Sequence, residues 1–573
     1  MKRFADQIRT ALAAATGLDA SSLKLEKPRD VALGDFAFPC FVLAKELRQA
    51  PPAIAADLAA KLESELGPTI TAAATGPYLN FKVDGAALAS AVLLDAAEAG
   101  DGYGRSDEGG GRKVVIDMSS PNIAKPMHVG HLRSTILGAA LYRMHDLLGY
   151  QPVSINHIGD WGSQFGKLVA AIDRWGDEYD VEGDPIPALL ALYVRFHDEA
   201  EGDDSLEEEA RAAFRELESG EDGAVRATWR KITELSLAEF GKTYDRLGVD
   251  FDLVRGEAWY EDKLDATVER IDASGITEES DGALIVDLSS IRKKMAPCLL
   301  RKSDGTTLYA TRDMAALFSR QDEFAFERCL YVVGSDQKLH FEQLKGVLKR
   351  MQLDWEPRVE HVAFGMMRLP GGKLSTRKGK VVFLSDVLDR AVEEAARIIA
   401  EKNPDLARSE RAADIAEQVG VGAIVFNDLK RERIKDVVFD WDEVLSFEGE
   451  TGPYVQYTHA RMCSILRKAE AQGEPGEGCE APDWSALEDA RGLVLAIGRY
   501  PEAIRTAAAE CEPSHLTQFL LGLCRDLNSW YATSRVLGEA PGITAARLAL
   551  VDAARAVLHA GLCMLGVAAP DEM

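Results

Sequence analysis

The first hundred residues alternate between helix-like and strand-like patterns. Phe4, Ile8 and Leu12 recur at four-residue spacing, which predicts an amphipathic helix. Residues 100–112 contain six glycines and almost no apolar side chain, which is typical of a linker. We therefore expect a small α+β domain with its linker over 1–105. The other elements predicted in this domain are helices over 53–66 and 86–99 and a strand over 78–83.

The pattern then changes to buried strands that alternate with helices. Residues 113–117 are consistent with a buried strand, which is followed by a polar turn, a helix over 130–148 and a second strand over 152–156. Such a βαβ unit predicts a parallel sheet. The α/β pattern returns between 307 and 351, after a long, mostly polar helical stretch. We expect a Rossmann-like, doubly wound parallel sheet domain over 106–385, with a helical insertion at about 175–295.

From Leu384 onward the pattern is helical almost to the end, broken by a polar, glycine-containing loop at 471–482. This predicts a helical connector over 386–450 and a C-terminal helical bundle over 451–573. The expected fold class is therefore multidomain α/β plus α.

Composition excludes several classes of protein. The 573 residues are too many for one hydrophobic core, and no run of about 18 apolar residues predicts a membrane span or a membrane partner. The eight cysteines include no C-x-x-C pair, which argues against a disulfide framework or a structural zinc knot. Reduced thiols and a cytoplasmic location are the simpler expectation.

The net charge of −27 would by itself disfavour a nucleic-acid partner. Much of the acid lies in surface-like runs such as 199–209, whereas cations cluster at 373–380 and at 430–435. Because phosphate binding depends on local charge, these two clusters remain candidate phosphate contacts.

The most informative segment is 119–131, with the sequence SSPNIAKPMHVGH, between a predicted strand and a predicted helix. Ligands bind at this position in doubly wound sheets, beside a helix N-terminus. His128 and His131 lie three residues apart, and Gly130 between them leaves space for a flat base. The two imidazoles could donate hydrogen bonds to nucleotide phosphates. The alternatives are a metal pair, which lacks a third ligand at motif spacing, or two ordinary histidines at a helix start.

A second candidate phosphate site is the segment 371–380, with the sequence GGKLSTRKGK. Glycines, hydroxyls and cations such as Lys373, Ser375 and Lys378 suit a loop that closes over a polyphosphate. By itself the same segment could be a basic surface turn.

Together these segments resemble the class I aminoacyl-tRNA synthetases, with a HIGH-type motif and a KMSKS-type loop that bracket ATP. The segment 119–131, NHIGDWGSQFG at 156–166, LYATRD at 308–313, GDFAFP at 34–39 and GETGPYVQY at 449–457 are similar to arginyl-tRNA synthetases. The resemblance runs from about residue 30 to the final residue. It implies ATP binding by His128, Gly130, His131 and Lys373.

A guanidinium is best recognised by carboxylates in a fixed geometry. Tyr309 and Asp313 are four residues apart, so on a helix they would face one pocket. Asp117 ends the strand that leads into the histidine segment. Without the resemblance, Asp313 would be assigned to a helix salt bridge and Tyr309 to a half-buried core ring. The resemblance implies an arginine site formed by Asp117, Ser120, Pro121, Asn122, His131, Tyr309, Asp313 and Gln337.

The KMSKS-type loop departs from the class pattern, because Thr376 stands where the second lysine is expected. Lys125 and Lys378 are the candidate substitutes, with Lys125 preferred. The resemblance then implies catalytic roles for Lys125, His128, His131, Lys373, Ser375 and Lys378.

The implied reaction activates arginine with ATP and transfers the arginyl group to tRNA(Arg). Mg²⁺ is expected to accompany ATP, and no zinc is expected. The bundle is expected to read the anticodon by stacking, and the chain to be a monomer. The candidate contacts are Tyr454, Tyr457, His459, Arg461, Trp530, Tyr531 and Arg535.

Four other interpretations remain. A cysteine-specific class I synthetase would need a zinc-type Cys/His set, which the spacing does not provide. A smaller nucleotidyltransferase would not need the helical C-terminus. A non-catalytic RNA-binding relative would be expected to lose His128, His131 or the 373–380 loop, which are present. The last is an acidic multidomain protein with chance motifs.

Overall fold

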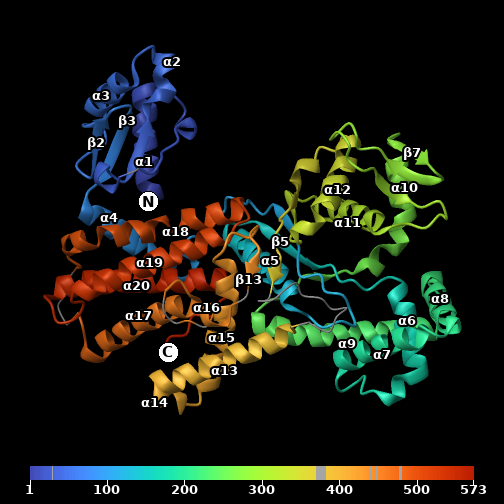
Figure 1. Cartoon of the computed structure of the whole chain (residues 1–573). Coiled ribbons are helices and arrows are strands. Elements are labelled where there is room, and N and C mark those ends of the chain that lie inside the picture. The colour runs from blue at the N-terminus through green and yellow to red at the C-terminus, as the bar shows by residue number, and fades with distance from the viewer. Residues whose placement is uncertain (29, 369–381, 439, 445, 447–448, 476–480) are drawn as a thin grey trace.

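A computed structural model of the chain describes residues 1–28, 30–368, 382–438, 440–444, 446, 449–475 and 481–573. Figure 1 shows an N-terminal module set apart at one end, a helical bundle beneath it and a central parallel sheet beside the bundle. No helix within the described residues is both long and apolar enough to cross a bilayer.

The N-terminal module is an antiparallel sheet covered by helices. Its strand order is β1 (Phe36–Pro39), β3 (Tyr78–Val83), β2 (Ile70–Thr75). Phe4, Ile8 and Leu12 are buried along α1 (Lys2–Thr16), so the four-residue spacing marks the face that packs on the module. The helix α3 (Pro51–Leu62) packs on this sheet, whereas α4 (Gly85–Ala99), which follows β3, packs against the bundle.

The central sheet is parallel, with the order β11-β10-β4-β5-β6. β4 (Lys113–Asp117) and β5 (Gln151–Asn156) are joined by α5 (Val129–Leu147), which confirms the predicted βαβ unit. α5 is buried around most of its circumference because it packs against the sheet on one side and the bundle on the other. The remaining strands are β6 (Leu253–Val254), β10 (Arg328–Tyr331) and β11 (Val359–His361).

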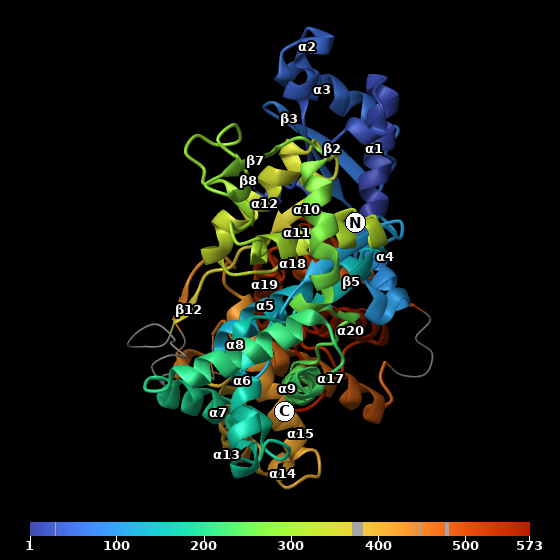
Figure 2. The ribbon, with the colours of Figure 1, turned by 90° about the vertical axis from the view of Figure 1, so that its right-hand side faces the viewer.

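The stretch 175–295 is not a uniform helical insertion. Its first part is helical and, with α6, forms the lower arm in Figure 2. The chain then returns to the sheet at β6, and β7, β8 and β9 form a small antiparallel sheet. β7 (Thr277–Ser280) is polar and mostly exposed, so no apolar alternation marked it in the sequence. The bounds are α6 (Ser163–Trp175), α7 (Pro185–Ala200), α8 (Asp204–Ser219), α9 (Ala224–Leu247), α10 (Leu264–Asp272), β8 (Ala283–Val286) and β9 (Cys298–Arg301).

The second half of the sheet domain contributes α11 (Tyr309–Phe324) and α12 (Lys338–Arg350), which flank β10 and agree with the α/β pattern expected over 307–351. Beyond it the chain is helical apart from the short strands β12 (Met367–Arg368) and β13 (Val437–Val438). The expected fold class is confirmed. The C-terminal helices are α13 (Leu384–Lys402), α14 (Pro404–Ala407), α15 (Ala412–Leu429), α16 (Trp441–Val444), α17 (Gly452–Gln472), α18 (Arg491–Ala509), α19 (Ser514–Thr533) and α20 (Pro541–Met564).

Candidate functional site

The loop between β4 and α5 has an unusual backbone. Ser119, Ser120 and Ala124 have φ values of 72°, 53° and 59°, in the left-handed region that non-glycine residues rarely occupy. Such conformations persist only where the surroundings impose them, and they concentrate at functional sites.

Side chains from distant elements hold this loop in place. On α9, Tyr244 OH lies 2.8 Å from Ser119 Oγ, and Ser236 Oγ accepts a hydrogen bond from the Ala124 N–H at 3.0 Å. Asn156 Oδ1, at the end of β5, accepts from the Ser120 N–H at 3.2 Å. The helical arm therefore supports the backbone of the histidine segment.

The two histidines share one arrangement at the start of α5. Their rings stack with centroids 3.9 Å apart, and Nδ1 of each accepts a backbone N–H: Gly130 donates to His128 at 3.0 Å, and His128 donates to His131 at 3.1 Å. A ring whose Nδ1 accepts carries its proton on Nε2 when neutral. Both Nε2–H groups are therefore available as donors.

Burial keeps both rings neutral. It lowers the pKa of His128 and lowers that of His131 to about 3, with the neighbouring His128 adding to the effect. A side chain at position 130 would meet the His128 ring, since an added Cβ would lie 2.7 Å from its Cε1. Gly130 thus makes room for the capping histidine. Its contact with a nucleotide base stays a prediction.

Asp313 and Tyr309 meet around one histidine. On α11, Asp313 Oδ2 lies 2.6 Å from His340 Nε2, and the Tyr309 ring centroid lies 4.7 Å from that of His340. His157 Nε2 is 4.0 Å from the other carboxylate oxygen. The neighbouring Arg312 pairs with Glu261 at 2.6 Å. The partners of Asp313 are therefore histidines, and Arg312 is not among them.

Glu257 is a candidate that the sequence analysis missed. Burial raises its pKa to about 7, and Asp313 and Asp160 are among the neighbouring carboxylates that add to the rise, against Arg312. The 156–166 segment positions it: Asp160 Oδ1 accepts from the Ala258 N–H at 2.9 Å, and the Glu257 N–H donates to the Ile158 carbonyl at 3.1 Å. No sequence motif surrounds Glu257, so only the fold reveals its nearness to Asp313.

The other predicted arginine contacts have diverse surroundings. Asp117 is buried, with Oδ2 2.7 Å from Arg320 Nη2 and Oδ1 accepting from Ser120 Oγ at 3.1 Å. Asn122 is exposed and lies against Gly159, where an added Cβ would collide with its Oδ1. Gln337 is exposed just before α12, and Pro121 is buried. Their roles toward arginine stay predictions.

The lysine candidates divide into two groups. Lys125 is partly buried in the strained loop, with Nζ 3.5 Å from Gln164 Oε1. Lys373, Ser375, Thr376 and Lys378 lie outside the residues that the structure describes.

The C-terminal bundle contains a cleft of about 660 Å³ between α17 and α19. Tyr457, Arg461 and Tyr531 line it, and the Arg461 guanidinium lies 4.9 Å from the Tyr457 ring centroid. Glu572 and Met573 form part of its wall. Aromatic rings beside cations suit unstacked bases.

The remaining predicted tRNA contacts do not line this cleft. His459 is fully buried, so no base can stack on it in this conformation. Tyr454 is half-buried and accepts a hydrogen bond from Asn528 at 3.1 Å. Trp530 is buried, and Arg535 is exposed with its Nε donating to the Leu537 carbonyl at 2.9 Å.

Comparison with protein families gives three matches that together span most of the chain. Residues 2–83 match the arginyl tRNA synthetase N terminal domain, residues 96–441 match tRNA synthetases class I (R), catalytic domain, and residues 455–573 match the DALR anticodon binding domain.

Curated relatives and solved structures agree over the whole length. An arginine–tRNA ligase of Latilactobacillus sakei is 45% identical over 577 residues, covering 100% of both chains. One of Alkaliphilus metalliredigens is 45% identical and covers 96% of this chain and 95% of the relative. The arginyl-tRNA synthetase of Thermus thermophilus superimposes with a TM-score of 0.83 at 29% identity, with 100% of each chain covered.

Proposed function

Because the chain belongs to the arginyl-tRNA synthetase family, we propose an assignment of its described residues to the steps of arginine–tRNA ligation. The enzyme activates arginine with ATP and charges tRNA. In our assignment the histidine pair acts at the ATP phosphates, Asp313 and Glu257 bind the guanidinium, and the α17–α19 cleft receives the anticodon.

At the phosphates, the assignment rests on the histidine tautomers. The arginine carboxylate attacks the α-phosphate in line, and pyrophosphate leaves, so the enzyme needs no protein nucleophile. The Nε2–H groups of His128 and His131 donate to phosphate oxygens as negative charge shifts during displacement. Lys125, in the strained loop beside them, replaces the missing loop lysine in this assignment.

For the guanidinium, the observation that carries the proposal is that the Asp313 carboxylate lies close enough to the buried Glu257 carboxyl for its charge to raise the pKa of Glu257. Burial is the main cause of the raised pKa of Glu257, and repulsion from the ionised Asp313 carboxylate adds to it. A bound guanidinium removes the repulsion, since it offers donors to both in a planar fork. Tyr309, 56% exposed at the start of α11, would cover the ligand.

Asp313→Asn and Glu257→Gln test this assignment. Each should raise the KM for arginine by about 10- to 100-fold, the effect of losing one charged hydrogen bond. The matched control is Asp322→Asn, a surface carboxylate on the same helix that pairs with Arg270. Citrulline, the neutral isostere, provides the second measurement. Discrimination between arginine and citrulline should fall in both variants, and unchanged discrimination would refute the assignment.

Tyr531→Ala and Arg461→Ala test the anticodon cleft. Each should raise the KM for tRNA by roughly 10-fold, because stacking on one base contributes about 1–3 kcal/mol. The KM for arginine should stay the same. Arg535→Ala is the control, since Arg535 is exposed but does not line the cleft. If Arg535→Ala weakened tRNA binding and the cleft variants did not, the anticodon would bind elsewhere on the bundle.

The proposal also includes the metal ion that accompanies ATP, the oligomeric state and the cellular location. Mg²⁺ accompanies ATP as part of the substrate, because magnesium binds mainly through phosphates and few protein ligands. The chain acts as a monomer in the cytoplasm, where the tRNA pool lies. The thiols support this location, since no disulfide joins any of the seven cysteines that the structure describes. Analytical ultracentrifugation of the purified protein tests whether it is a monomer.

A further inference from the structure

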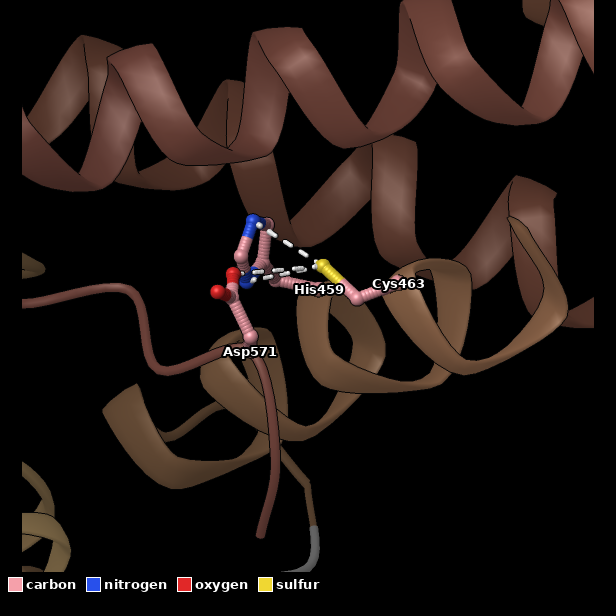
Figure 3. Close-up of side chains that lie close together, drawn as sticks. All are labelled: His459, Cys463 and Asp571. Carbon is pink, nitrogen blue, oxygen red and sulfur yellow. Dashed lines mark hydrogen bonds between the residues drawn. The ribbon is translucent and has the colours of Figure 1, made fainter. Parts of the chain in front are cut away.

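Three potential metal ligands converge in the C-terminal bundle, far from the histidine pair in sequence. His459 and Cys463 lie four residues apart on α17, and Asp571, in the segment after α20, points toward them (Figure 3). One ligand atom from each lies within 4.8 Å of the others. His459 is fully buried, Cys463 is 6% exposed and Asp571 is exposed.

The distances match the edges of a tetrahedral site. Cys463 Sγ lies 3.7 Å from His459 Nε2 and 3.6 Å from Asp571 Oδ1. Around a tetrahedral zinc ion with ordinary bond lengths, sulfur and nitrogen or oxygen ligands stand about 3.5 Å apart. To bind an ion held by His459 Nε2, the Cys463 and Asp571 side chains would turn toward it, because Sγ now lies nearly as close to Nδ1, at 4.0 Å, as to Nε2.

The His459 ring makes a backbone hydrogen bond that is typical of a metal ligand. Its Nδ1 lies 3.0 Å from the Pro570 carbonyl oxygen, an acceptor, so Nδ1 carries the proton. The lone pair of Nε2 is then open to an ion, and Cys463 Sγ lies to one side of it, 3.7 Å from Nε2 and 4.0 Å from Nδ1. A histidine that binds metal commonly donates its second nitrogen to a backbone carbonyl in this way.

We propose that His459, Cys463 and Asp571 bind one zinc-class divalent ion. Metal binding forms an Sγ–metal bond and releases the thiol proton of Cys463 to solvent, with no change of oxidation state. Three protein ligands leave a fourth position for water. The His559 ring, whose centroid is 5.7 Å from that of His459, is an alternative to water as the fourth ligand.

The ion would fix one wall of the α17–α19 cleft. Asp571 directly precedes Glu572 and Met573, which line the cleft opposite Tyr457 and Arg461. This consequence rests on the proposed anticodon function of the cleft. The metal site itself does not depend on it.

Cobalt titration of the full-length, chelator-treated protein tests the site. Co²⁺ bound to a thiolate gives a charge-transfer band in the near ultraviolet, which we expect to saturate at one ion per chain and to disappear when Zn²⁺ is added. Cys463→Ser should abolish the band, and Asp571→Asn should weaken binding by about tenfold or more. Cys563→Ser, which alters a partly exposed thiol of α20 outside the cluster, should leave it unchanged.

Asp571 is exposed, so its substitution keeps the test valid even if Cys463→Ser misfolds. A protein that gives no charge-transfer band, or a band that survives in Cys463→Ser, would overturn the proposal: Cys463 would then be a thiol that donates a hydrogen bond to Asp571. Removing the ion should raise the KM for tRNA. If the ion binds and this KM does not change, the link to the cleft is wrong while the metal site stands.

Discussion

At the scale of single residues, the structure explains how one helix start can serve a nucleotide. His128 and His131 each use Nδ1 to satisfy a backbone N–H that the first turn of α5 would otherwise leave without a partner. The same hydrogen bonds fix the tautomer and direct both Nε2–H groups away from the helix. Local capping and the proposed phosphate recognition thus depend on the same two rings.

Glu257 gives a prediction of pH dependence. Its pKa of about 7 in the free enzyme means that the side chain is protonated below that pH and ionised above it. Because cationic arginine favours the ionised form, the KM for arginine should fall as the pH rises through 7. Glu257→Gln should remove this dependence. An equally steep profile in that variant would assign the titration to a group other than Glu257.

At the scale of elements, α5 is the part around which the enzyme is organised. It begins at the histidine pair, packs on β4 and β5 and touches α13, α15, α18 and α20. Arg133, 1% exposed, links it to three other segments: its Nε lies 2.9 Å from Asp428 Oδ1 on α15, and Nη1 donates to the Gly365 and Lys435 carbonyls. The histidine helix and the connector are therefore held as one body.

Breaking this ion pair should destabilise the protein strongly. Asp428 is 2% exposed, so Asp428→Asn leaves the Arg133 guanidinium buried without its counter-charge. We expect a loss of about 3–5 kcal/mol in the free energy of unfolding, read from the urea midpoint. Asp389→Asn, which removes an exposed partner of Arg246, should cost about 1 kcal/mol or less.

The double variant Arg133→Met, Asp428→Leu separates burial from pairing. It should be more stable than Asp428→Asn, because no unpaired charge remains. If the single variant lost no more than Asp389→Asn, the pair would not hold α5 to α15.

At the scale of the whole molecule, two arginines connect the sheet domain to the bundle. Arg328 on β10 pairs with Glu360 at 2.7 Å and donates to the Ala508 carbonyl at the end of α18. Arg433 donates to the Ala363 carbonyl and to the Cys511 carbonyl just beyond α18. Cations at a helix C-terminus are favourable because that end carries partial negative charge. These contacts fix the position of the bundle relative to the central sheet.

The net charge of −27 gives a prediction for the whole molecule. Like charges repel across the folded surface, and salt shortens the range of this repulsion from about 30 Å at 0.01 M to about 8 Å at 0.15 M. The Tm, measured by scanning calorimetry, should therefore rise over this range of KCl. A Tm that stayed constant or fell would mean that screening of the surface ion pairs outweighs relief of the repulsion.

The sequence alone determined the features that depend on local order. The four-residue spacing of Phe4, Ile8 and Leu12 predicted α1, because burial of one helix face needs only the right spacing of apolar residues, and the apolar run 113–117 predicted the buried strand β4. The histidine pair of the segment 119–131 could be recognised for a similar reason: its residues are contiguous, so the chain itself brings them together, while its contact with a nucleotide stays a prediction.

Only the tertiary structure decided what depends on distant partners. Glu257 lies near Asp313, and Asp571 lies near His459, although each pair is far apart in the sequence and no motif links its members. The same holds for burial: His459 looked like a stacking residue, but packing of α17 against the chain end placed it inside. The sequence specifies which chemical groups the side chains carry. Their proximity and solvent exposure arise from long-range packing, and proximity and exposure together set pKa values and ligand geometry.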